Sequence, residues 1–205
     1  MAPTPGITDE AVERAVVALR SGGAVVLPTD TVYGLAALPT VDGAVDRLYA
    51  LKGRPADMPV AVLVADVEQV RALADLPDPA RRLAGAFWPG PLTLVLPRRP
   101  GLDLPLGGAA ATIGVRWPDH PLVARLATAV GPLATTSANR TGRPTPVTAG
   151  EAAASLTGDV AAVLDGGPCA GTASTVVDVT GPEPVVLREG GLVEAQVRAA
   201  LAARR

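Results

Sequence analysis

The chain alternates short apolar runs with amphipathic segments along almost its whole length. Runs such as 24–28 and 59–66 are continuously apolar, as expected of strands that are buried on both faces. Between the runs, apolar residues recur with helical spacing, as at Val12, Val16 and Leu19. Buried strands that alternate with helices favour an α/β fold, in which helices cover the faces of one sheet.

The same patterns predict the individual elements. Helices are expected over 9–21, capped by Thr8, and over 42–51, 67–76, 78–87, 121–130, 148–156 and 193–203. Strands are expected over 24–28, 59–66, 92–97, 112–117, 132–137, 160–165, 174–180 and 184–189. The last two strands resemble a hairpin, so the sheet should be mixed. The Pro/Gly-rich stretches 97–108 and 140–146 are too short to divide the chain, so we predict one domain over 1–205.

Composition excludes several classes of protein. The 205 residues carry 18 Lys+Arg against 20 Asp+Glu, a formal charge of −2, so nucleic acid could be held only by a local basic patch. His120 and Cys169 are the single His and Cys, which excludes a disulfide framework and a Cys/His zinc site, and we predict no metal held by protein side chains. No apolar stretch approaches the ~20 residues of a membrane span, and residues 1–10 lack the pattern of a leader. We therefore expect a cytoplasmic protein without membrane contact.

Short polar clusters follow or interrupt the predicted strands, at 28–35, 52–55, 112–116, 135–144, 171–175 and 187–190. Loops at strand ends build the ligand crevice of α/β sheets, and hydroxyl and guanidinium groups there suit an anionic ligand. For any single cluster, ordinary turn and cap chemistry is the stronger explanation. No P-loop, dinucleotide turn or G-x-S-x-G motif is present, so phosphate binding would have to be unconventional.

Lys52 is the only lysine among 18 basic residues. Either this position requires a compact ammonium that a guanidinium cannot replace, or the lysine has been kept there by chance. The sequence leaves both explanations open.

Taken together and in order, the clusters resemble the YrdC-type family of threonylcarbamoyl-AMP synthases. The resemblance runs from about Gly22 to Gly190. It rests on PTDTVYGL (28–35), K-x-R-P (52–55) followed by Pro59, WPGPLTLVL (88–96), R-x-P-x-H-P (116–121), SAN-x-x-G-x-P (137–144) and S-T-V (174–176) before LREG (187–190).

The resemblance implies an open twisted mixed sheet with a large concave pocket. It also implies synthesis of threonylcarbamoyl-AMP and pyrophosphate from L-threonine, bicarbonate and ATP, with Mg²⁺ accompanying ATP. Other proteins would then transfer the threonylcarbamoyl group to tRNA, with at most weak tRNA contact by this chain. Because the chain ends soon after LREG, it matches the short form of the family.

The resemblance also implies site residues. Lys52 and Arg54 would be catalytic, offsetting phosphate charge, since such transfers depend on positioning and on cations. Threonine would be bound by Thr31, Arg116, Thr135 and Ser174, with the Arg116 fork on its carboxylate. ATP would be bound by Arg54, Thr112, Ser137, Asn139, Thr145 and Arg188.

Met58, Leu63, Thr136 and Ala173 depart from residues frequent in the family. Two alternative functions remain: a non-catalytic RNA-binding or ribosome-assembly module, against which the charge and the 2% aromatic content argue, and a carbamoyl-handling enzyme with another acceptor.

Overall fold

The computed structural model describes residues 6–203; residues 1–5 and 204–205, which include part of the stretch searched for a leader, lie outside it. Its helices are α1 (Asp9–Arg20), α2 (Ala44–Lys52), α3 (Val67–Leu73), α4 (Asp78–Phe87), α5 (Pro121–Val130), α6 (Ala149–Ala154) and α7 (Glu194–Ala202). Its strands are β1 (Val25–Leu27), β2 (Gly34–Ala37), β3 (Ala61–Leu63), β4 (Leu92–Pro97), β5 (Thr112–Arg116), β6 (Leu133–Ser137), β7 (Ala162–Val163), β8 (Thr175–Asp178) and β9 (Val185–Arg188).

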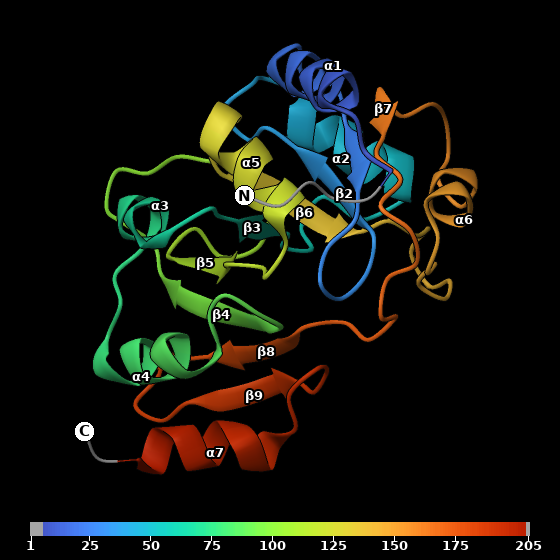
Figure 1. Cartoon of the computed structure of the whole chain (residues 1–205). Coiled ribbons are helices and arrows are strands. Elements are labelled where there is room, and N and C mark those ends of the chain that lie inside the picture. The colour runs from blue at the N-terminus through green and yellow to red at the C-terminus, as the bar shows by residue number, and fades with distance from the viewer. Residues whose placement is uncertain (1–5, 204–205) are drawn as a thin grey trace.

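All nine strands form one open sheet in the order β7-β1-β2-β6-β3-β5-β4-β8-β9 (Figure 1). Three neighbouring pairs are parallel, namely β1/β7, β3/β5 and β4/β8, and the others are antiparallel. The hairpin predicted at the C-terminal end is the antiparallel pair β8/β9. The predicted α/β class and mixed sheet are therefore confirmed.

One strand was missed. Residues 28–35 were assigned to a polar cluster and no strand was predicted between 28 and 59, but Gly34–Ala37 is β2, between β1 and β6. The sequence GLAA contains no β-branched or aromatic residue, so no local preference marks it as a strand. Its antiparallel partners on both sides supply the hydrogen bonds that hold it extended.

Other predictions failed only at element ends. Thr8 does cap α1, accepting a hydrogen bond from the Ala11 backbone at 3.2 Å. The strand expected over 160–165 is reduced to Ala162–Val163, because β7 pairs with only two residues of β1.

The helices cover the two sheet faces unequally. On one face α2, α3, α4, α6 and α7 contribute to a single large apolar cluster. On the other, α1 and α5 pack over β1, β2 and β6, through residues such as Val12, Leu19 and Leu126. Figure 1 shows α1 near the β7 end of the sheet, α5 next to α1 on the side toward β3, and α7 beyond the β9 end. Neither α1 nor α5 covers this second face over β4 and β8, and that face holds the site described below.

No helix in the described part of the chain is both long and apolar enough to cross a membrane.

Candidate active site

The site is a pocket of about 350 Å³ over the second face of the sheet. Strand register sets its floor: Val95 lies beside Gly114, and Ala61 lies beside Thr135. A Cβ on Gly114 would stand 3.6 Å from the Cβ of Ala61, so two of the smallest side chains lie together at the centre. Larger residues surround them, and the floor is therefore hollow in the middle.

Arg116 forms the polar end of the pocket. The residue is 5% exposed. It pairs in register with Leu63 of β3 on one side and with Thr93 of β4 on the other. The guanidinium donates from Nη2 to Asp30 Oδ1 at 2.5 Å, from Nη1 to Thr31 Oγ1 at 2.7 Å and from Nε to the Gly90 oxygen at 3.1 Å. Burial lowers the pKa of Arg116, and the Asp30 carboxylate opposes that shift. Three of its five N–H groups are thus engaged, and two remain for a ligand.

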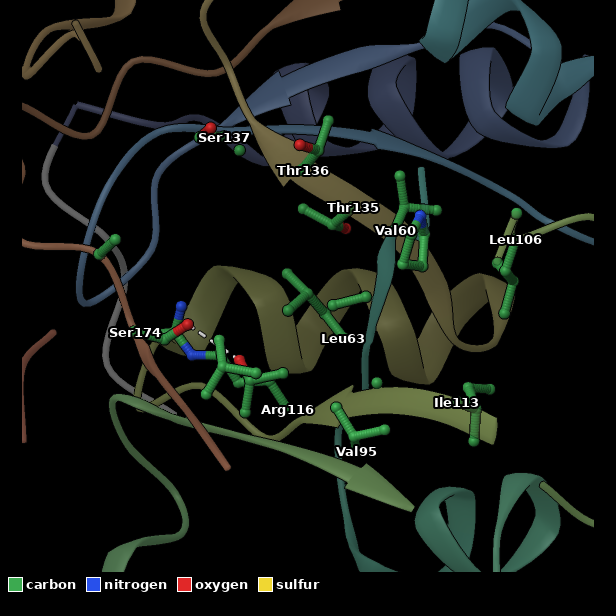
Figure 2. Close-up of a pocket in the computed structure, with 18 of the residues that line it drawn as sticks. Val60, Leu63, Val95, Leu106, Ile113, Arg116, Thr135, Thr136, Ser137 and Ser174 are labelled. Atoms are coloured by element: carbon green, nitrogen blue, oxygen red, sulfur yellow. Dashed lines mark hydrogen bonds between the residues drawn. The ribbon is translucent and has the colours of Figure 1, made fainter. Parts of the chain in front are cut away.

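Ser174 lies at the same end, near Arg116 in Figure 2. Its hydroxyl is 2.9 Å from Thr93 Oγ1, and its backbone oxygen accepts from Arg188 Nη2 at 2.8 Å. Burial lowers the pKa of Arg188.

Gly190 makes this arrangement sterically feasible. A Cβ there would stand 2.1 Å from the Ala173 oxygen and 2.6 Å from the Ser174 carbonyl carbon, so only glycine permits the approach. The glycine of LREG therefore keeps Arg188 beside Ser174.

Lys52 lies behind the pocket lining rather than within it. It is 3% exposed, and its Nζ donates to the backbone oxygens of Ser137 and Asn139 at 2.6 and 2.8 Å. Ser137 Oγ at 3.3 Å and Asn139 Oδ1 at 3.1 Å complete a cage of four oxygens. Burial, with a smaller contribution from Arg54, lowers the pKa of Lys52 to about 8. The ammonium thus holds the loop that follows β6 in place.

Arg54 belongs to the opposite, largely apolar end. It donates to the backbone oxygens of Met58 and Pro59 at 3.3 and 2.8 Å, which leaves its charge without a carboxylate partner among the described residues. Val60, Leu106 and Ile113 line this end, across the pocket from Ser174 (Figure 2). The two ends therefore differ in chemistry: one binds polar groups and the other offers an apolar wall beside a cation.

Most of the predicted site residues are gathered here. Those that line the pocket are Arg54, Thr112, Arg116, Thr135, Ser137, Thr145, Ser174 and Arg188. Three do not line it: Lys52 and Asn139 lie beneath the Ser137 loop, and Thr31 is 2% exposed and bound to Arg116. The lining also includes Arg98 and no Asp or Glu, so the pocket is locally positive in a chain of net charge −2.

Sequence reasoning missed Asp30, Thr29, Thr93 and Arg98. Asp30 pairs with Arg116, and the other three line the pocket. Thr93 did carry a signal, because it is a lone hydroxyl within the apolar run LTLVL. Arg98 gave none, since it stands in a Pro/Arg loop and reaches the site by donating to the Thr112 oxygen at 3.2 Å.

Of the positions that depart from the family pattern, Leu63, Thr136 and Ala173 line the pocket, whereas Met58 does not and is 41% exposed. The first three therefore alter the surface that faces a ligand.

Tyr33 and His120 both lie outside the lining. Tyr33 is fully buried and donates to the Gly167 oxygen at 2.6 Å; burial raises its pKa to about 12. His120 occupies the N-cap position of α5 without a side-chain cap bond, and burial lowers its pKa. The hydrogen bond of Tyr33 ties the loop after β1 to the segment around Gly167.

Comparison with known proteins identifies the family of the chain. Residues 17–190 match the Sua5/YciO/YrdC family model, which carries the description "Telomere recombination". The chain belongs to the Sua5/YciO/YrdC family. The resemblance predicted from its motifs is therefore confirmed.

Relatives in this family include a protein of Mycobacterium tuberculosis (strain ATCC 25618 / H37Rv), named as a candidate threonylcarbamoyl-AMP synthase. It is 47% identical over 178 residues, which cover 86% of this chain and 82% of the relative. The threonylcarbamoyl-AMP synthase of Bacillus subtilis (strain 168) is 40% identical over 197 residues, or 94% of this chain and 57% of the relative.

A solved structure of Pyrococcus abyssi Sua5 complexed with L-threonine superposes with a TM-score of 0.88 at 39% identity. The match covers 93% of this chain and 57% of that one, so the chain spans little more than half the length of the Bacillus and Pyrococcus proteins.

Proposed function

We propose that this chain is an L-threonylcarbamoyladenylate synthase. The single observation that carries the proposal is the division of one pocket into a guanidinium- and hydroxyl-lined end at Arg116 and Ser174, and an apolar end with Arg54, in a chain related to threonylcarbamoyl-AMP synthases. A volume of about 350 Å³ is within the range of small-molecule sites.

The polar end takes threonine in this proposal. The two unengaged N–H groups of Arg116 hold its carboxylate, while Ser174 and Thr135 are the hydroxyls that face its side chain. Thr31 acts on threonine only through Arg116, since its hydroxyl accepts a hydrogen bond from the guanidinium and orients it.

The apolar end takes adenosine, with Leu106 and Ile113 against the base and Arg54 and Thr112 beside it. The phosphates then extend toward Ser137, Thr145 and Arg188. Ser137 is presented by Lys52 and Asn139, so these two are positioning residues for ATP.

The reaction proceeds in two balanced steps. The threonine amine combines with bicarbonate to form a carbamate, and water is released. A carbamate oxygen then attacks the α-phosphorus of ATP; the bond from that phosphorus to the bridging oxygen breaks, and its electron pair leaves with pyrophosphate. Because charge develops on the phosphate oxygens, fixed guanidinium groups stabilise the transition state.

Mg²⁺ enters as the complex with ATP in this proposal. The pocket lining offers hydroxyls and guanidinium groups but no carboxylate, so a metal that takes its ligands mainly from phosphate oxygens and water fits it. Bound there, the ion would neutralise part of the triphosphate charge. The product would pass to tRNA-modifying proteins, which places the proposed activity in the cytoplasm.

The decisive experiment is direct detection of threonylcarbamoyl-AMP. Purified chain is incubated with MgATP, L-threonine and bicarbonate, and adenylate and pyrophosphate are measured together. Equal amounts of the two, formed only when all three substrates are present, are expected. Pyrophosphate release that does not depend on threonine or bicarbonate would contradict the proposal, and RNA binding without turnover would favour the non-catalytic alternative.

A further inference from the structure

A second, open groove adjoins the pocket where the loop after β6 leads into α6. Its lining includes Arg140, Arg143, Thr145, Glu151 and Ser155. Thr145 lines both the groove and the pocket, so both cavities border that residue. The groove therefore lies next to the part of the pocket toward which the phosphates extend in the proposed function.

Arg140 and Arg143 differ from the other arginines between residues 6 and 203. Every other arginine in that range donates a side-chain hydrogen bond to a carboxylate, hydroxyl or backbone oxygen. Arg140 and Arg143 donate none within the described residues, and both are exposed. Glu151 is the single acid in the groove lining and forms an ion pair with neither.

The backbone that carries these arginines is nevertheless fixed. Asn139 Nδ2 donates to the Arg140 and Arg143 oxygens at 3.2 and 2.6 Å, and the Arg143 backbone N–H donates to the Arg140 oxygen at 3.0 Å. The Thr141 backbone N–H donates to the Lys52 oxygen at 3.0 Å, which ties the turn to α2. A rigid turn that presents two unpaired guanidinium groups loses little backbone entropy when it binds an anion.

We propose that this groove is a subsite for inorganic pyrophosphate, which Arg140 and Arg143 receive as it leaves the pocket. The inference rests on the proposed function, which supplies a diphosphate at the Thr145 end. Two forked guanidinium groups match the several anionic oxygens of a diphosphate, and Glu151 offsets only one of their charges. A long RNA is disfavoured because the chain as a whole carries a charge of −2.

The test measures binding of inorganic pyrophosphate by calorimetry, with Mg²⁺ present, to the full chain and to the double variant Arg140→Gln/Arg143→Gln. We expect the variant to bind at least 10-fold more weakly. The matched control is Arg14→Gln/Arg71→Gln, which also removes two positive charges from exposed helix surfaces and should bind within 2-fold of the parent. If the double variant unfolds at a lower temperature than the parent, the single variant Arg143→Gln replaces it in the test. Its affinity for pyrophosphate is expected to fall at least 3-fold.

A second readout is inhibition of adenylate formation by added pyrophosphate. Its inhibition constant should rise at least 10-fold in the double variant. The KM for threonine should change less than 2-fold, because neither Arg140 nor Arg143 is among the residues proposed to hold threonine. Equal pyrophosphate binding in parent and variant, or equal loss in the control, would overturn the proposal. Loss of tRNA binding with pyrophosphate binding retained would also overturn it and assign the groove to RNA.

The two proposals can fail separately. Pyrophosphate binding requires no turnover, so arginine-dependent binding in a chain that makes no adenylate would retain the subsite and refute the synthase. Adenylate formation with arginine-independent pyrophosphate binding would do the reverse.

Discussion

The ammonium of Lys52 lies 2.6 Å from the backbone oxygen of Ser137, a residue that lines the pocket although Lys52 itself does not. The only lysine of the chain therefore reaches the site through the loop that it holds. A compact ammonium can donate to oxygens from several directions, whereas a planar guanidinium cannot enter the same cage. This favours a specific requirement for lysine over a chance survivor.

The pH dependence of Lys52 follows from its pKa of about 8, below the ordinary value of 10.5. As the pH rises past 8 the ammonium loses its proton, and kcat should fall by about tenfold per pH unit as the loop is released. Stability should respond with the opposite sign. The folded protein gives up this proton before the unfolded chain does, so the titration raises the free energy of unfolding between pH 8 and 10.5.

The measurement is a profile of kcat from pH 6.5 to 9.5 for the parent and for Lys52→Arg. The arginine variant should be at least 100-fold slower at pH 7 but should lack the alkaline limb, because its charge persists. The same limb in the variant would assign that titration to another group.

Arg116 and Asp30 should separate binding from stability. Arg116→Ala leaves the Asp30 carboxylate, whose side chain is 15% exposed, without its partner, and should cost about 3 kcal/mol in the free energy of unfolding. It should also raise the KM for threonine much more than that for ATP, by the equivalent of ~1.5–3 kcal/mol.

The double variant Arg116→Met/Asp30→Asn removes both charges. It should regain most of the stability while threonine binding stays weak. Chemical denaturation and steady-state kinetics give the two quantities, and recovery of the threonine KM in the double variant would show that Arg116 acts only on folding.

Side-chain selectivity follows from the hydroxyls of Thr135 and Ser174. Serine, which lacks only the methyl group, should lose ~1–3 kcal/mol in kcat/KM. Valine should be rejected by ~10⁴-fold or more, because a methyl group replaces the hydroxyl that this polar end is proposed to bind. In Ser174→Ala the discrimination against valine should shrink. Comparable turnover of valine and serine by the parent would mean that the site does not recognise the hydroxyl of the threonine substrate.

Gly190 gives a steric prediction with a control elsewhere in the chain. Gly190→Ala places a methyl group 2.1 Å from the Ala173 oxygen, so it should destabilise the fold by about 1–3 kcal/mol and raise the KM for ATP as Arg188 moves. Gly150 lies in α6, where an added Cβ would meet no atom within 4 Å, so Gly150→Ala should stabilise the protein by roughly 0.5–1 kcal/mol. Thermal unfolding of both variants, with ATP kinetics, tests the contrast; equal melting temperatures would refute it.

Local pattern alone determined the elements with strong periodicity and the motifs at their ends. Strands such as β4 and helices such as α1 can be predicted from sequence, because apolar spacing and capping residues act over a few residues. The order of the motifs was sufficient to predict the family. It also predicted eight of the residues that line the pocket, because the motifs lie on the strands or in the loops that join them.

Tertiary structure decided what depends on neighbours distant in the sequence. The strand at Gly34–Ala37 forms because β1 and β6 pair with it. No side chain in GLAA favours a strand by itself. Asp30 meets Arg116, 86 residues away, only because the loop after β1 crosses the end of β5. Lys52 lies in its oxygen cage for the same reason: its four oxygen partners lie 85 and 87 residues along the chain, and only folding brings them around one ammonium.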